Sequence, residues 1–172
     1  MANSVKKKFK ISKANVVLAY TAGLIDGEAY IGIDHQNAAK FSGKRRSDFY
    51  RMNVSVNVTD KSMTDFLMRH FGGYYRTRKR LTVNGRLVHS WYIDGDRAIA
   101  FLQAILPYMV AKKDQARLGI KFRKSFGPMY CKTGVPSAVI KLRHSCYEKF
   151  KEIHGRHSAK ALPPKPLRLP ER

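Results

Sequence analysis

The sequence has few acidic residues, few cysteines and no long apolar run. Twelve Asp and Glu stand against 34 Lys and Arg, which leaves a formal charge of +22. The two cysteines, Cys131 and Cys146, form no CxxC pair and no larger even framework, so we expect inert thiols in a reducing compartment. Because no stretch of about eighteen apolar residues is present, we expect no membrane partner.

Motifs for nucleotide and nucleophile chemistry are also missing. We find no Walker loop, no dinucleotide fingerprint and no Ser/His/Asp arrangement, so a nucleotide cofactor is not expected. The basic start, residues 1–10, is not followed by an apolar core with a cleavage site. We therefore expect an intracellular protein, in the cytoplasm of a prokaryote or in an organelle matrix.

The composition favours one folded and strongly basic domain. Of the 172 residues, 44% are hydrophobic, which argues against a disordered basic chain. We divide the sequence into a basic N-terminal arm (1–11), a single domain (12–156) and a Pro-rich basic tail (157–172) expected to be disordered. Such a charge repels itself unless it meets a polyanion, of which nucleic acid is the commonest. Non-specific binding to a membrane surface is the alternative explanation of this charge.

Apolar periodicity predicts helices and strands in a regular order. The clearest signal is the alternation over 51–59, typical of a strand with one packed and one wet face. Gly27 is expected to end the first helix. The Asn84–Gly85 turn predicts a hairpin. The predicted helices are 13–25, 61–71, 97–109 (stopping near Pro107), 112–122 and 135–154, and the predicted strands are 29–35, 51–59, 74–81 and 87–93.

The segment Ala22–Glu28, at the end of the first predicted helix, resembles the signature of the LAGLIDADG homing endonucleases. The order of elements from Ser12 to about Phe122 also resembles the αββαββα core of that family. The resemblance implies an α+β fold with an antiparallel four-stranded sheet as a DNA-binding saddle, extended here by C-terminal helices.

Small residues in this segment predict a helix-to-helix contact. Ala22 and Gly23 would let a second backbone approach closely. With one motif and no internal repeat, the second helix would come from another copy, which predicts a twofold homodimer. By resemblance, Asp26 would cap or support the helix end at this interface.

The resemblance also implies a catalytic site. Glu28 and the carbonyl of Gly27 would hold Mg²⁺, with Mn²⁺ as a possible substitute and Ca²⁺ expected to bind without supporting cleavage. Two Glu28 carboxylates meeting across a twofold axis would repel each other, which calls for cations. Lys112 would lie near the scissile phosphate, and Asp60 would order water. The alternatives are a solvated lysine for Lys112 and a helix cap for Asp60.

Polar residues on the wet strand faces suit base reading in the major groove of double-stranded DNA. For the fourth strand the opposite face, with Leu87, His89, Trp91 and Ile93, is an alternative. A strand of about ten residues spans roughly ten base pairs, so a dimer would cover on the order of twenty. The predicted DNA-binding residues are Gly32, Asp34, Gln36, Arg51, Asn53, Ser55, Asn57, Arg76, Arg78, Arg80, Ser90 and Tyr92. The predicted phosphate contacts are Lys40, Lys44, Arg45, Arg46, Lys113, Arg117, Lys121 and Arg123.

These observations together predict an intron-encoded homing endonuclease, a hydrolase that makes metal-dependent double-strand breaks at a long, pseudo-palindromic DNA site. Two other classes stay open. One is an RNA splicing maturase or a non-cleaving DNA-binding protein of the same fold, and the other is a basic structural protein.

Overall fold

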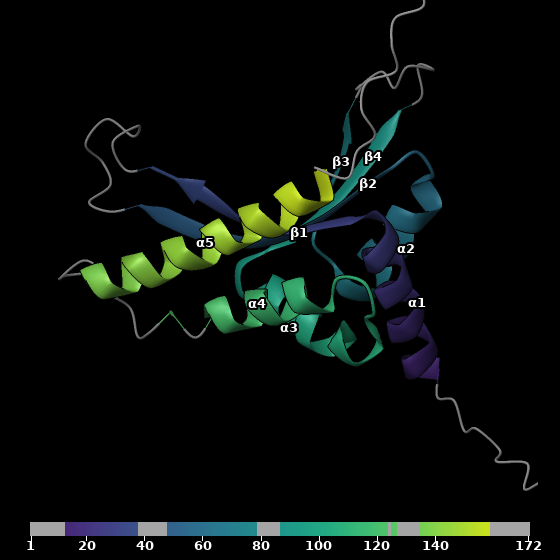
Figure 1. Ribbon diagram of the computed structural model, residues 1–172. Helices are drawn as coiled ribbons and strands as arrows, with labels where there is room; N and C mark the ends of the chain where they lie inside the picture. Colours follow the sequence, from purple (N-terminus) through teal and green to yellow (C-terminus); the bar gives the residue numbers. More distant parts are fainter. Residues whose placement is uncertain (1–12, 38–47, 79–86, 124, 127–134, 159–172) are drawn as a thin grey trace, which may run out of the picture.

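The computed structural model describes residues 13–37, 48–78, 87–123, 125–126 and 135–158 (Figure 1). The predicted order of one helix, two strands, one helix, two strands and further helices is confirmed, and the class is α+β. The elements are α1 (Lys13–Glu28), β1 (Ala29–Gln36), β2 (Phe49–Val58), α2 (Lys61–Phe71), β3 (Tyr74–Arg78), β4 (Val88–Asp94), α3 (Gly95–Ile105), the 3₁₀ turn η2 (Leu106–Tyr108), α4 (Lys113–Arg123) and α5 (Ser137–Ser158).

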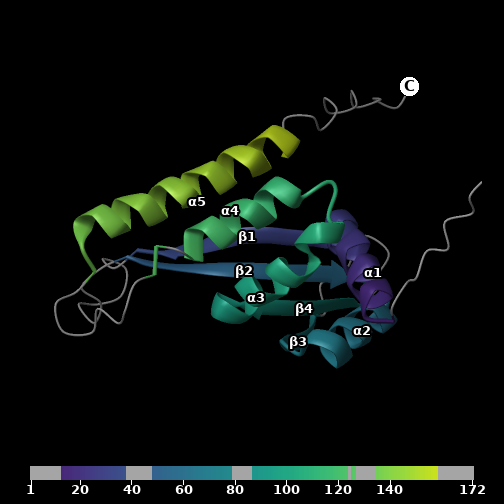
Figure 2. The same cartoon turned by 90° about the horizontal axis from the view of Figure 1, so that it is seen from below.

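The four strands form one antiparallel sheet in the order β1-β2-β4-β3. In β2 every second side chain is buried, and the intervening positions are more exposed, because alternate residues point to opposite faces. Helices α1, α2, α3 and α4 cover the buried face (Figure 2), and the core lies between them and the sheet. The other face stays open, which leaves a polar surface available to a ligand.

Helix α5 runs along the outer edge of β1, on the side away from β2 (Figure 2). Its buried residues Cys146 and Phe150 join the hydrophobic core. The Tyr50 hydroxyl and His144 Nδ1 lie 3.1 Å apart and share a hydrogen bond between strand and helix. The helix therefore covers a strand edge that would otherwise be free to pair. None of the described helices has the length and apolar character needed to cross a bilayer.

Several element boundaries differ from the prediction. Helix α1 continues through Gly27 to Glu28 and passes directly into β1, so it ends one or two residues later than predicted, and Gly27 does not have the positive φ expected of a helix stop. Gly72, by contrast, has φ 66° and ends α2, with its N–H bonded to the Met68 carbonyl. Helix α5 reaches Ser158, inside the segment expected as tail. The Asn84–Gly85 turn lies outside the described residues.

Candidate active site and nucleic-acid interface

Helix α1 divides its residues between two faces. Thr21, Ala22, Leu24 and Ile25 are buried. Ala22 is 0% exposed, so it packs in the core of its own protomer and not on the outer side with Gly23, as the sequence had suggested. The apolar side chains of Leu24 and Ile25 belong to the same hydrophobic core. Burying them also buries Ala22, which lies on the same side of the helix.

The opposite face of α1 is a stripe of small and apolar residues, formed by Val16, Tyr20, Gly23 and Gly27. Val16 and Tyr20 are 54% and 52% exposed. A Cβ added at Gly23 or Gly27 would meet no heavy atom within 4 Å. Spacings of four, three and four residues place all of them on one side of a helix. This small-residue stripe therefore has room for a second helix.

Asp26 binds backbone groups far along the chain. Its Oδ2 accepts a hydrogen bond from the Val110 N–H at 2.7 Å, and its Oδ1 accepts one from the Lys112 N–H at 2.9 Å. The predicted support of the helix end is thus a clamp on the loop between η2 and α4. Because both carboxylate oxygens are used, the loop is fixed in register with the end of α1.

Lys112 points back at the same helix end. Its Nζ donates to the carbonyl of Ala29 at 2.6 Å and to the carbonyl of Ile25 at 3.1 Å. Partial burial lowers the pKa of Lys112, whereas the charges of Asp26 and Glu28 act in the opposite direction. The solvated-lysine alternative is therefore wrong. An ammonium has three donors, so one remains for an anion beside Glu28.

Glu28 is the last residue of α1, and its side chain is exposed. Its carboxylate and the Gly27 carbonyl are hard oxygen donors, the kind that Mg²⁺ prefers. Within the described ranges, no group of three or more His, Cys, Asp or Glu residues lies close enough to hold a metal ion. One protomer thus offers a single carboxylate here, which suits a metal that keeps waters and binds phosphate oxygens.

Asp60 is the N-cap of α2. Its Oδ1 accepts a hydrogen bond from the Ser62 N–H at 2.8 Å. Hydrogen bonds from the Ser62 side chain, and secondly from the Ser62 backbone, lower the pKa of Asp60. The helix-cap alternative is the one that the structure shows. A role for Asp60 in ordering water stays a prediction.

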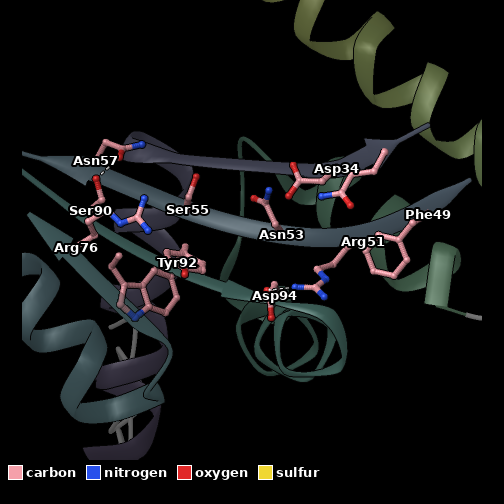
Figure 3. A pocket seen from close by; sticks show the side chains of 12 residues that line it. Asp34, Phe49, Arg51, Asn53, Ser55, Asn57, Arg76, Ser90, Tyr92 and Asp94 are labelled. Atoms are coloured by element: carbon pink, nitrogen blue, oxygen red, sulfur yellow. Dashed lines mark hydrogen bonds and ion pairs between the residues drawn. The ribbon is translucent and has the colours of Figure 1, made fainter. Parts of the chain in front are cut away.

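A groove lies on the open face of the sheet (Figure 3). Nine of the predicted DNA-binding residues line it, together with three that were not predicted. Trp91 and Ile93 are 0% and 3% exposed, so the alternative assignment of faces for β4 is wrong. The predicted lining residues are Asp34, Gln36, Arg51, Asn53, Ser55, Asn57, Arg76, Ser90 and Tyr92, and the others are Phe49, Trp91 and Asp94.

Two predicted positions differ from expectation. Gly32 lies on the groove side of β1 but is buried, because the Tyr30 ring occupies the space where a Gly32 side chain would be. Tyr30 itself stacks on His154 of α5 with ring centroids 4.6 Å apart.

Lys113 begins α4, which covers the opposite face of the sheet (Figure 2), so it lies away from the groove. Arg78 ends β3, and Arg80 lies outside the described residues.

The predicted phosphate contacts on α4 also lie on the helix side. Arg117 pairs with Asp114 at 3.0 Å, and Arg123 pairs with Asp96 at 2.6 Å. Arg123 binds Asp96 through both Nε and Nη2, whereas Arg117 uses only its Nη1 and keeps other N–H groups for a ligand. Lys40, Lys44, Arg45 and Arg46 lie outside the described residues.

Sequence reasoning missed Phe49 and Asp94. Asp94 pairs with Arg51, whose Nη1 lies 2.8 Å from its Oδ2, and the Arg51 guanidinium lies 5.2 Å from the Phe49 ring centre. A signal for Asp94 was available, because it follows Ser90 and Tyr92 at the period of two. The predicted strand ended at Ile93, one residue too early to include it.

Comparisons with known proteins identify the fold. No family model and no curated protein matches the sequence. Among solved structures, the homing endonuclease I-CvuI, in complex with the I-CreI target, matches with a TM-score of 0.66 and 17% identity over 81% of this chain and 83% of that one. The archaeal intron-encoded homing endonuclease I-Vdi141I, complexed with DNA, matches with a TM-score of 0.61 and 13% identity over 81% and 85%.

The LAGLIDADG homing endonuclease I-GzeII, in complex with its DNA target, matches with a TM-score of 0.61 and 13% identity. The match covers 90% of this chain and 53% of that chain, so this chain spans about half its length. The chain therefore has the LAGLIDADG homing endonuclease fold. The resemblance drawn from Ala22–Glu28 is confirmed at that level.

Proposed function

We propose that this chain is a site-specific DNA endonuclease that acts as a homodimer and uses a divalent metal. The observation that carries the proposal is the arrangement at the end of α1. There Asp26 fixes the loop of Lys112, and the Lys112 ammonium lies on the carbonyls that flank Glu28. A carboxylate, an ammonium with a spare donor and a polar groove on the same domain suit phosphodiester hydrolysis.

Glu28 and the Gly27 carbonyl would hold Mg²⁺, with the second copy supplying the same pair. The metal would supply charge neutralisation at the phosphate and a more acidic water. Lys112 would bind a phosphate oxygen and stabilise the negative charge that develops on it. The I-CvuI complexes with DNA were obtained in the presence of 2 mM Mg, with the DNA not cleaved, or of 2 mM Ca, which supports the choice of a divalent ion.

The small-residue stripe on α1 supports the homodimer. Two protomers joined through this stripe would bring two Glu28 side chains together and join two grooves into one long surface. Gly23→Leu tests the contact, because a Cβ added at Gly23 meets no heavy atom within 4 Å in the protomer. In the protomer alone, this change should stabilise the helix by about 1 kcal/mol.

Gly155→Leu is the matched control, since Gly155 is also helical and exposed, and a Cβ added there meets no heavy atom within 4 Å. We expect Gly23→Leu to shift the protein from dimer to monomer in sedimentation and to abolish cleavage, and Gly155→Leu to do neither. A Gly23→Leu protein that stays dimeric and active would refute this interface.

Cleavage is tested with Glu28→Gln, which keeps the shape of the side chain and removes its charge. Wild-type protein is selected on randomised duplexes in Ca²⁺, and the selected duplex is then incubated with Mg²⁺ or Mn²⁺. We expect wild type to cut both strands, and the variant to bind with similar affinity and to cut at least about a thousandfold more slowly. Wild-type protein that binds one duplex tightly and never cuts it would favour the non-cleaving class.

A further inference from the structure

Two carboxylates of the groove lie beside Arg51, one of its two arginines, although the chain as a whole carries a charge of +22. Asp34 of β1 lies directly opposite Arg51 of β2 in the strand register. Asp94 of β4 lies on the other side and forms the 2.8 Å ion pair with Arg51 (Figure 3). Carboxylates are repelled by DNA phosphates. Their position on a DNA-facing surface therefore calls for a specific partner.

Asp94 uses its side chain in an unusual way. It is the N-cap residue of α3, where an aspartate commonly accepts a helix N–H, yet it makes no such side-chain bond. Its carboxylate contacts Arg51 instead. Asp96, two residues later, pairs with Arg123 of α4 and does not line the groove. The two carboxylates at this helix start thus serve different surfaces.

Arg51 is held on one side and open on the other. Its side chain is 47% exposed, and only its Nη1 contacts Asp94, so other N–H groups remain for a ligand. Asp34 takes part in no ion pair within the part of the chain that the structure describes. Asn53, the next groove residue along β2, lies opposite Asp94 in the register, and its buried Oδ1 lacks a hydrogen-bond partner. The donors of Arg51 and the acceptors of Asp34 therefore face the groove side by side.

Building on the proposed function, we propose that Arg51 and Asp34 together read one G·C base pair, with Asp94 as the positioning residue. Arg51 donates to guanine O6 and N7, and Asp34 accepts from the cytosine N4 amino group. Residues directly opposite on neighbouring strands have Cβ atoms about 5 Å apart, which suits the two bases of one pair. Six residues of strand separate Glu28 from Asp34, roughly 20 Å, so the base pair lies about six pairs from the cut.

The test compares full-length wild type with Arg51→Lys, Asp94→Asn and Asp34→Asn, selected in Ca²⁺ on duplexes randomised over about twenty base pairs. We expect wild type to prefer G·C at one position of each half-site by roughly fivefold to 150-fold. Arg51→Lys keeps the charge but loses the planar fork, so it should lose that preference and keep the rest of the profile. Asp34→Asn should weaken the preference for cytosine as the partner base at the same position.

Asp94→Asn distinguishes two possible effects of Asp94, namely the positioning of Arg51 and the general repulsion of DNA by a negative charge. Removing a negative charge strengthens binding to every duplex if charge alone matters. If Asp94 positions Arg51, the preference at that one position weakens as well. Asp96→Asn is the matched control, because it removes a carboxylate paired with an arginine at the same helix start. We expect this control to leave the profile unchanged.

The proposal is overturned if Arg51→Lys and Asp94→Asn leave every position of the profile as in wild type, or if Asp94→Asn only tightens binding by one common factor. Thermal unfolding checks that each variant is folded. If Asp94→Asn does not fold, the result for Arg51→Lys tests the proposal. Failure of the proposed function has a different result, since wild type would then select no duplex, or would select one and not cut it in Mg²⁺.

Discussion

The end of α1 and the groove of the sheet are both polar, but their polar groups are held in different ways. At the end of α1, Asp26 and Lys112 bond to backbone atoms more than eighty residues away along the chain. In the groove, Arg51 binds Asp94 and Ser90 binds Asn57, each through contacts between side chains. A change at the first region should therefore disturb the fold and the chemistry together, and a change in the second should alter recognition alone.

The largest effect separating the two regions is expected for Lys112→Met. Without an ammonium beside the phosphate, cleavage should fall by about 10² to 10³, while binding in Ca²⁺ changes little. Single-turnover cleavage and equilibrium binding on the same duplex measure both. Equal losses in binding and cleavage would mean that Lys112 contributes to DNA binding and not to the cleavage step, as expected of a groove residue.

The lowered pKa of Lys112 adds a pH signature to this contrast. Because burial favours the neutral amine, the charged form is lost at a lower pH than for an ordinary lysine. We expect cleavage to decline at alkaline pH in wild type, and Lys112→Arg, whose charge does not titrate, to retain its own lower rate there. Parallel pH profiles of the two proteins would contradict a role for the charge of Lys112.

Asp26→Asn should have an intermediate effect on both fold and activity. The amide keeps one acceptor oxygen and turns its NH₂ group toward an N–H donor, so one backbone group of the loop loses its partner. We expect a loss of about 1–3 kcal/mol in the free energy of unfolding and a tenfold to hundredfold slower cleavage. Urea unfolding and cleavage rates measure these effects.

Asp65→Asn is the control for Asp26→Asn. Asp65 pairs with Lys61 on the surface of α2 at 2.7 Å, so its loss should cost less than about 1 kcal/mol. If the two variants unfold at the same urea concentration, the hydrogen bonds of Asp26 to the loop stabilise the protein no more than a surface ion pair does.

The same contrast explains what the sequence could predict. The face assignment in all four strands follows from a period of two, so nine groove residues were predicted from local pattern alone. Glu28 and Lys112 were found through a resemblance, and the sequence held no sign of how they are fixed. The bonds of Asp26 to Val110 and Lys112 depend on tertiary packing, which no local period encodes. Ala22 was misplaced because a small residue fits a buried helix face as well as an interface.

Gly32→Ala should have a smaller and more local effect. The added methyl group would meet the Tyr30 ring, which can swing away because it is the end of a flexible side chain. We expect a loss of about 1 kcal/mol in stability from the disturbed Tyr30–His154 stack, with cleavage within about threefold of wild type. Tyr30→Phe, which keeps the stack, is the control. A loss of cleavage much larger than the loss of stability would tie Tyr30 to the active site.

The smallest effect on the fold is expected for Asn57→Ala. Asn57 is exposed and contributes one hydrogen bond, accepted from the Ser90 hydroxyl at 2.7 Å. Ser90 is 6% exposed, and truncating the exposed Asn57 side chain opens the Ser90 hydroxyl to water, so the stability should change by less than about 1 kcal/mol. A base preference at one position of the selected duplex should nevertheless disappear. If Asn57→Ala destabilised the protein as much as Asp26→Asn, the groove would be part of the structural framework, and its side chains could not change with the DNA target independently of the fold.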